Sequence, residues 1–135
     1  MPSLDNMMLR QIIMDHYENP RNRELVEDDS YKKVNMDSET CIDNIDIQAK
    51  IENGVIEDIR FDGEACAICT SSTSIMTELL IGKTIDEARV IIENYMNMIF
   101  EKDYDPEILE EAIAFYNTHK QANRIKCATL GWKGI

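Results

Sequence analysis

The chain has 135 residues, 26 of them acidic and 14 basic, and a net charge of −12 at neutral pH. This is the length of one ordinary domain, so we expect residues 1–135 to form a single domain around its own core. The acidic excess opposes contacts with phosphate backbones and argues against a nucleic-acid partner. No apolar run reaches membrane-spanning length, and the N-terminal segment lacks the pattern of a secretion signal. We therefore expect a cytoplasmic protein with no membrane partner, whose four cysteines bind metal or react.

The first predicted element is a helix from about Ser3 to Tyr17. Asn19-Pro20 ends it, because the residue before a proline is pushed out of helical geometry. Residues 21–40 are polar with little periodicity and predict a loop or a weak strand. The apolar stripe of the helix is expected to comprise Leu9, Ile12, Ile13 and Tyr17.

An antiparallel hairpin is predicted in the middle of the chain. Apolar and polar residues alternate strictly from Ile45 to Ile51, which is typical of a half-buried strand. Asn53-Gly54 is a strong signal for a tight turn. The return strand is expected to end at Asp62-Gly63. The apolar residues of the two strands are Ile45, Ile47, Ala49 and Ile51, then Val55, Ile56, Ile59 and Phe61.

Two helices are predicted after the hairpin. Residues 71–80 begin with small hydroxylated side chains and end before Gly82, a residue suited to terminate a helix. The second helix starts at Thr84, and Glu87 three residues later completes the pattern of a capping box. Its expected apolar stripe comprises Ile85, Ala88, Ile92, Tyr95 and Ile99.

The last part of the chain also predicts helices. Asp105-Pro106 begins one of them, since proline is favoured at the first helical position. A short final helix is expected after Cys127. Strands early and helices late predict an α+β domain, in which helices cover one face of a small antiparallel sheet. The expected inward residues after Pro106 are Leu109, Ala112, Ile113 and Tyr116.

The cysteines suggest a metal site. Cys41 precedes the predicted hairpin and Cys66 follows it, so the fold-back of the hairpin brings them together. Asp43 points to the same side as Cys41, because side-chain direction repeats every second residue in an extended chain. Cys127 would complete the set. Thiolates and a carboxylate match the ligands that tetrahedral zinc accepts.

Other interpretations of the cysteines remain open. Buried cysteine is a common small core residue, so these positions also fit packing alone. Cys66 and Cys69 have the spacing of a zinc knuckle or a redox pair, but the chain offers no second close pair and no βαβ unit. Cys69 is therefore interpreted as a small residue on the first turn of a helix. His16 is interpreted as a cap or packing residue, and His119 as a cation at a helix end.

Basic residues bracket the last cysteine. Arg124, Lys126 and Lys133 lie close to Cys127 in sequence. Positive charge near a cysteine favours the thiolate, which is the form that binds metal and attacks sulfur. The alternative is that these basic residues are ordinary surface charges with no role at Cys127.

Four segments, in order along the chain, resemble the U-type proteins of iron–sulfur cluster assembly. They are residues 13–22 with their His-Tyr-x-x-Pro-Arg-Asn type ending, Cys41-Ile42-Asp43, residues 63–68 around Cys66, and residues 124–132 around Cys127. Each segment alone is a modest signal, but together they are specific. The resemblance covers nearly the whole chain.

The resemblance implies a function for these residues. Members of the scaffold branch carry histidine directly before the last cysteine, whereas this chain has Lys126, as in the SufU-like branch. That branch implies zinc held by Cys41, Asp43, Cys66 and Cys127, with Arg124 close by. Cys41 would leave the zinc and accept persulfide sulfur when a cysteine desulfurase docks. The sulfur would then pass to the cluster-building complex, so the activity is a sulfurtransferase-type relay and not that of a small-molecule enzyme.

Two alternatives follow from the same resemblance. The cysteines would also suit a scaffold that binds iron, assembles a [2Fe–2S] cluster and passes it to recipient apo-proteins. A binding module that has lost transfer is the other alternative. The chain departs from the family pattern at Ile42 and Ala65, which replace usual glycines beside the first and second cysteines. A β-branched residue does not adopt positive φ cheaply, so the loop that carries Cys41 is expected to differ in shape.

Overall fold

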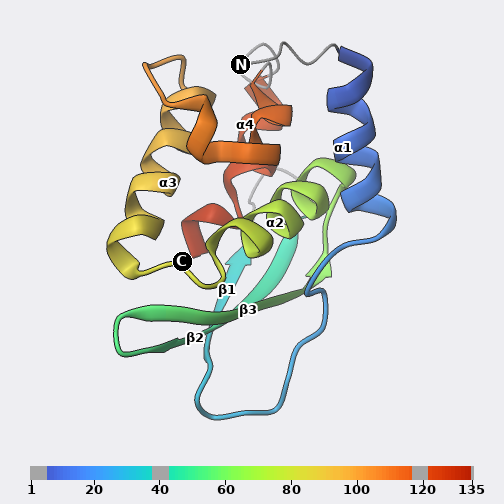
Figure 1. Ribbon diagram of the computed structural model, residues 1–135. Coiled ribbons are helices and arrows are strands. Elements are labelled where there is room, and N and C mark those ends of the chain that lie inside the picture. The colour runs from blue at the N-terminus through green and yellow to red at the C-terminus, as the bar shows by residue number, and fades with distance from the viewer. Residues whose placement is uncertain (1–5, 38–42, 117–121, 135) are drawn as a thin grey trace.

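A three-stranded antiparallel sheet forms the base of the molecule in a computed structural model that describes residues 6–37, 43–116 and 122–134. Strands β1 (Lys32–Asp37), β2 (Asn44–Glu52) and β3 (Val55–Glu64) are neighbours in chain order. The helices lie on one side of this sheet (Figure 1). The predicted α+β class and the predicted hairpin are confirmed.

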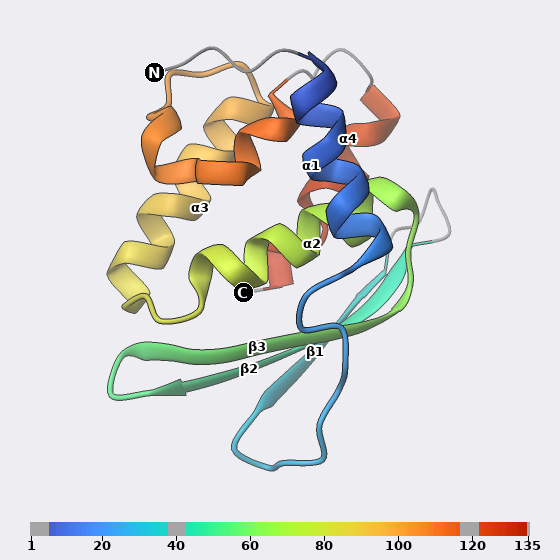
Figure 2. The ribbon, with the colours of Figure 1, turned by 45° about the vertical axis from the view of Figure 1, so that its right-hand side comes forward.

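Helix α2 (Ala67–Leu80) is the central element of the helical layer. It packs against β3, against α1 (Asn6–Glu18) and against α4 (Ala122–Thr129), and Figure 2 shows it running between the sheet and the other helices. The remaining elements are α3 (Ile85–Ile99) and the 3₁₀ helices η1 (Pro106–Phe115) and η3 (Trp132–Gly134). None of the helices in the described ranges combines the length and apolarity needed to cross a bilayer.

The weak strand that the sequence allowed is present at one edge of the sheet, and the predicted burial changes at two positions of the central strand β2. Residues 32–37, expected as a loop or weak strand, form the largely exposed edge strand β1. Ile51 is 43% exposed because the pairing of β2 with β3 shifts register after Lys50. Gln48 is buried on the face expected to be polar, where its side-chain amide exchanges two hydrogen bonds of 2.8 Å with the backbone of Val26.

Two predicted helix faces are wrong by one residue. In α1 the buried position is His16 and not Tyr17, because Leu9, Ile12, Ile13 and His16 follow the spacing of three, four and seven. In η1 the helix starts at the predicted Asp105 cap, but Phe115 is buried and Tyr116 is exposed. Glu110, with φ 46° and ψ −122°, interrupts η1, so the buried Ala112 and Phe115 do not continue the helical repeat that starts at Pro106.

Other helix boundaries were close to prediction. The capping box of Thr84 and Glu87 is present, and α2 ends before Gly82 at positive φ. Helix α2 begins four residues earlier than expected, at Ala67. The final helix contains Cys127 instead of following it.

Gly63 allows the close approach of β2 and β3 beside the end of the hairpin. It pairs with Ile45 and has φ +132°. A Cβ atom at this position would overlap the carbonyl oxygen of Asn44 and lie 2.9 Å from Cα of Ile45. A side chain here would therefore force the backbones of β2 and β3 apart, next to Asp43 and Cys66.

Replacement of Gly63 by alanine is predicted to lower the free energy of unfolding more than replacement of Gly82. Both glycines have positive φ, which costs an L-residue about 1–2 kcal/mol. Only Gly63→Ala adds a clash with backbone, whereas the space around Gly82 is open. Urea unfolding should show Gly63→Ala less stable than Gly82→Ala by at least about 1 kcal/mol. Equal losses would contradict the close approach described here.

Candidate metal centre

The two ends of the hairpin meet at Asp43 and Cys66. Asn44 pairs with Glu64 at the open end of β2 and β3, so the residues just outside this pair are neighbours. Asp43 is fully buried, and its Oδ1 accepts a hydrogen bond of 2.7 Å from the backbone N–H of Cys66. The Sγ atom of Cys66 lies 3.7 Å from Oδ2 of Asp43. The sequence predicted that Cys41 and Cys66 converge at this end of the hairpin, and Cys41 lies outside the described residues.

Cys66 is also the N-cap of α2. Its Sγ accepts a hydrogen bond of 3.4 Å from the backbone N–H of Cys69. The first N–H groups of a helix have no partner within the helix and favour negative charge nearby. The thiol group therefore lies where the backbone of α2 stabilises an anionic ligand. Cys69 itself is buried in the hydrophobic core on the first turn of α2, as predicted.

Cys127 reaches the same place from α4. Its side chain is buried, with 5% of the residue exposed. Asp43, Cys66 and Cys127 each offer one ligand atom, and these three atoms lie within 4.8 Å of one another. Three side chains that are distant in sequence therefore converge on one point.

A buried hydrogen-bond network holds the end of α4 against α2. The hydroxyls of Ser72 and Tyr95 both donate to the carbonyl oxygen of Ala128, at 2.6 and 2.7 Å. The indole N–H of Trp132 donates to Ser72 Oγ at 3.0 Å, and the Trp132 ring stacks on Tyr95 with centroids 3.8 Å apart. Burial raises the pKa of Tyr95 above its ordinary range, so its hydroxyl remains a donor. Sequence analysis did not identify this network, which fixes the residue next to Cys127.

The electrostatics of Cys127 differ from the prediction. Burial raises the pKa of its thiol, and the neighbouring Asp43 and Cys66 raise it further. Lys126, the residue before Cys127, is exposed on α4. In the absence of a cation, the group therefore favours the protonated thiol. A bound divalent ion would reverse this balance, because it stabilises coordinated thiolates.

The donor set fits a zinc ion. Bonds of about 2.3 Å to sulfur and about 2.0 Å to oxygen place neighbouring ligand atoms around tetrahedral zinc about 3.5 Å apart. The 3.7 Å between Cys66 Sγ and Asp43 Oδ2 is close to this spacing. Asp43, Cys66 and Cys127 supply three of the four positions of such a site.

Several predicted site residues are not among those that the structure describes. Cys41, expected as the fourth ligand, and Ile42 lie outside the described residues, as do His119 and the side chain of Arg124. Ala65, which precedes Cys66, is partly buried and packs against the core. A second group of potential ligands, formed around His16, was not expected from the sequence.

The family model of the NifU-like N-terminal domain matches residues 8–128. The chain belongs to this family. It is 40% identical over 129 residues to the zinc-dependent sulfurtransferase SufU of Bacillus subtilis (strain 168), covering 95% of this chain and 86% of that protein. It is 31% identical over 131 residues to the iron–sulfur cluster assembly scaffold protein IscU of Streptococcus pyogenes serotype M1, covering 96% and 81% of the two chains. The resemblance to U-type proteins is thereby confirmed.

Solved structures show the same fold. A putative iron–sulfur cluster assembly scaffold protein for the SUF system from Fervidobacterium islandicum AW-1 superposes with a TM-score of 0.84 at 30% identity, over 92% of this chain and 90% of that chain. The N-terminal part of a NifU-like protein from Brucella abortus has a TM-score of 0.78 at 22% identity, over 92% and 86%. The α+β arrangement is therefore that of the family.

Removal of the Asp43 carboxylate is predicted to destabilise the metal-free protein. Asp43→Ala leaves the N–H of Cys66 without its acceptor, and an unsatisfied buried donor costs about 1–3 kcal/mol. Asp43→Asn keeps an oxygen acceptor and should lose less. Urea unfolding in the presence of a chelator would measure both, with Asp46→Ala in β2 as the control. Equal stability of Asp43→Ala and Asp46→Ala would show that the bond does not hold the hairpin end to α2.

Proposed function

We propose that this protein takes part in iron–sulfur cluster assembly as a zinc-bound sulfur acceptor. In this proposal Cys41, Asp43, Cys66 and Cys127 hold the zinc ion, and Cys41 receives sulfur from a cysteine desulfurase. The observation that carries the proposal is the convergence of Asp43, Cys66 and Cys127, with ligand atoms within 4.8 Å of one another. Support also comes from the relative in Bacillus subtilis, which is named a zinc-dependent sulfurtransferase and aligns with 95% of this chain.

The transfer is a thiol–persulfide exchange. The thiolate of Cys41 attacks the outer sulfur of the desulfurase persulfide, a new S–S bond forms on Cys41, and the desulfurase cysteine leaves as a thiolate. The step needs no external oxidant or reductant, because sulfur moves without net electron transfer. Zinc has no redox chemistry of its own and would keep the coordinated thiolates deprotonated at neutral pH.

The remaining residues have supporting roles in this proposal. Asp43 orients the start of α2 through the Cys66 N–H, and Ser72 with Tyr95 holds the turn after Cys127. Arg124 and Lys126 lie on α4 one turn or less from Cys127. We propose a cysteine desulfurase and the cluster-building machinery as partners, in the cytoplasm.

A scaffold for a [2Fe–2S] cluster is the alternative. Thiolate sites accept iron–sulfur clusters as well as zinc, and the Streptococcus pyogenes relative is named a scaffold protein. The donors differ little between the two functions, so the bound metal decides between them. A binding module without transfer activity is the third option.

Protein purified without added metal is predicted to contain about one zinc ion per chain. Cys66→Ala and Cys127→Ala should each lower this content to less than a tenth, since each removes a ligand from a tetrahedral site. Cys69→Ala is the matched control, because Cys69 is buried nearby but lies outside the converging group. Elemental analysis of the folded variants measures the metal. Folded wild-type protein free of zinc, or equal loss in Cys69→Ala, would contradict the proposed site.

Cys41→Ser is predicted to abolish persulfide loading by a cysteine desulfurase. Serine lacks the sulfur that attacks the persulfide, whereas Cys69→Ala should load like the wild type. Mass spectrometry of the intact chain detects the added sulfur atom. Loading of Cys41→Ser at the wild-type level would exclude Cys41 as the acceptor.

A stable cluster with stoichiometric iron after anaerobic reconstitution, together with absence of zinc, would favour the scaffold function.

A further inference from the structure

A second group of potential metal ligands lies at the opposite end of α2 from the cysteine site. His16 of α1, Glu78 of α2 and Glu111 of η1 each direct one ligand atom toward a common point, and these atoms lie within 4.8 Å of one another. Cys66 and Glu78 are twelve residues apart along α2, so the helical rise separates the two groups by about 18 Å. The second group is therefore independent of the first.

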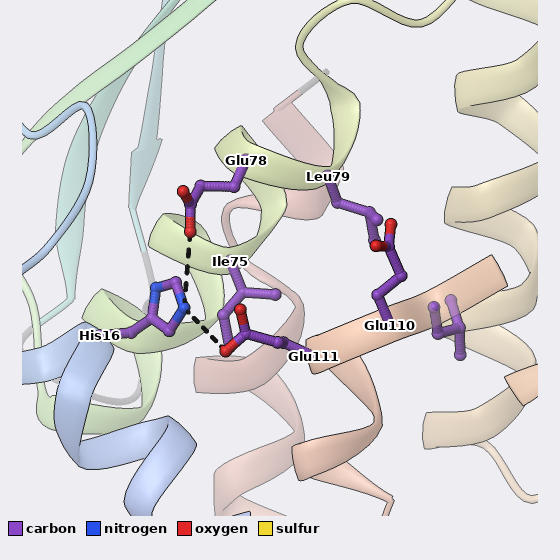
Figure 3. A pocket seen from close by; sticks show the side chains of 7 residues that line it. His16, Ile75, Glu78, Leu79, Glu110 and Glu111 are labelled. Carbon is purple, nitrogen blue, oxygen red and sulfur yellow. Dashed lines mark ion pairs between the residues drawn. The ribbon is translucent and has the colours of Figure 1, made fainter. Parts of the chain in front are cut away.

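The imidazole of His16 is buried and points into a cavity of about 230 Å³ (Figure 3). His16 is 0% exposed, and its Nε2 atom makes no hydrogen bond to any part of the chain that the structure describes. Nε2 lies 3.4 Å from Oε2 of Glu111 and 3.7 Å from Oε1 of Glu78. A buried nitrogen without a hydrogen bond is costly, so this atom is suited to a ligand that enters the cavity.

The other ring nitrogen of His16 is already held. Nδ1 lies 2.8 Å from the Ser74 hydroxyl, which also accepts the backbone N–H of Arg21 at 2.8 Å. Metal-binding histidines typically make such a bond through the second nitrogen, because it fixes the ring orientation and the tautomer. The tautomer in which Nδ1–H donates to Ser74 directs the lone pair of Nε2 toward the two glutamates. This is the arrangement of a ligand held ready for a metal.

The distances suit a metal ion with nitrogen and oxygen ligands. Bonds of about 2.1 Å at tetrahedral or octahedral angles place neighbouring ligand atoms about 3.0–3.4 Å apart. The observed 3.4 and 3.7 Å need only a small movement of the glutamates, whose side chains are 53% and 47% exposed and free to adjust. Arg21 is 3.7 Å from Glu78 but holds Asp15 more closely, at 2.7 Å, so Glu78 remains available.

We propose that His16, Glu78 and Glu111 form a second binding site, which takes a divalent first-row transition-metal ion such as Mn²⁺ or Fe²⁺. One imidazole and two carboxylates suit these ions, whereas Mg²⁺ and Ca²⁺ prefer oxygen ligands alone. Three protein ligands leave positions for water, and the open side of the cavity lets the ion exchange. The net charge of −12 adds a long-range attraction for cations.

Manganese separates this site from the cysteine site. Mn²⁺ stands lowest in affinity among the divalent metals and prefers oxygen and nitrogen ligands, so it does not displace zinc from thiolates. The full chain carrying one equivalent of zinc would be titrated with Mn²⁺, and the free ion would be counted by electron paramagnetic resonance. About one Mn²⁺ is expected to bind per chain, and it should broaden the imidazole NMR signals of His16, assigned in a His119→Gln variant.

Glutamine variants test the ligands. Glu111→Gln should weaken Mn²⁺ binding at least tenfold, because it removes a charged ligand without changing the size of the side chain. Glu110→Gln is the matched control, since Glu110 lines the same cavity on the side away from His16 and carries the same charge (Figure 3). It should change the affinity less than threefold. No bound Mn²⁺ in the wild type, or equal weakening in both variants, would overturn the proposal and leave only an ion pair of His16 or diffuse attraction by acidic residues.

Discussion

The hydrogen bond between the N–H of Cys66 and the carboxylate of Asp43 joins the sheet to the helical layer where the candidate metal ligands converge. It links Asp43, the residue before β2, to Cys66, the N-cap residue of α2. The direction of α2 over the sheet and the position of the Cys66 thiol are therefore set together. The close approach of β2 and β3 at Gly63 is a condition for this bond. From that point α2 carries the contacts that place α1, α4 and η1.

The local elements that could be predicted have strong short-range signals. Asn53-Gly54 defines the hairpin, and Thr84 with Glu87 defines the start of α3, whichever tertiary contacts surround them. The edge strand β1 was predicted only as a loop or a weak strand, because its residues are polar and its pairing depends on β2. The register of η1 was wrong because no regular helical repeat runs through Glu110, whose φ of 46° interrupts the helix.

The candidate metal centre was predictable only where a short-range signal determines it. A hairpin brings its own ends together, so Asp43 and Cys66 follow from local pattern alone. Cys127 does not, because its position depends on the buried bonds of Ser72 and Tyr95 to Ala128, which no sequence spacing encodes. Cys127 was named from its residue type as a candidate to complete the set, and the family resemblance supported this choice. The group around His16 combines residues of three elements, α1, α2 and η1, and no sequence motif predicts that these residues meet.

Burial of the thiol of Cys127 would favour a bound cation at the candidate metal centre. The thiol of Cys127 has a raised pKa because it is buried and lies against Asp43 and Cys66. The same crowding of potential anions makes a divalent ion favourable, since one ion replaces the protons and offsets the repulsion between ligands. Metal binding would thus release protons and tie α4 to the hairpin ends.

Zinc K-edge X-ray absorption of the protein as purified tests the central claim most directly. Convergence of three cysteines and one aspartate on a single ion predicts a four-coordinate shell with about three sulfur atoms at about 2.3 Å and one oxygen atom at about 2.0 Å. A shell of nitrogen and oxygen alone, or of four sulfur atoms, would contradict the account.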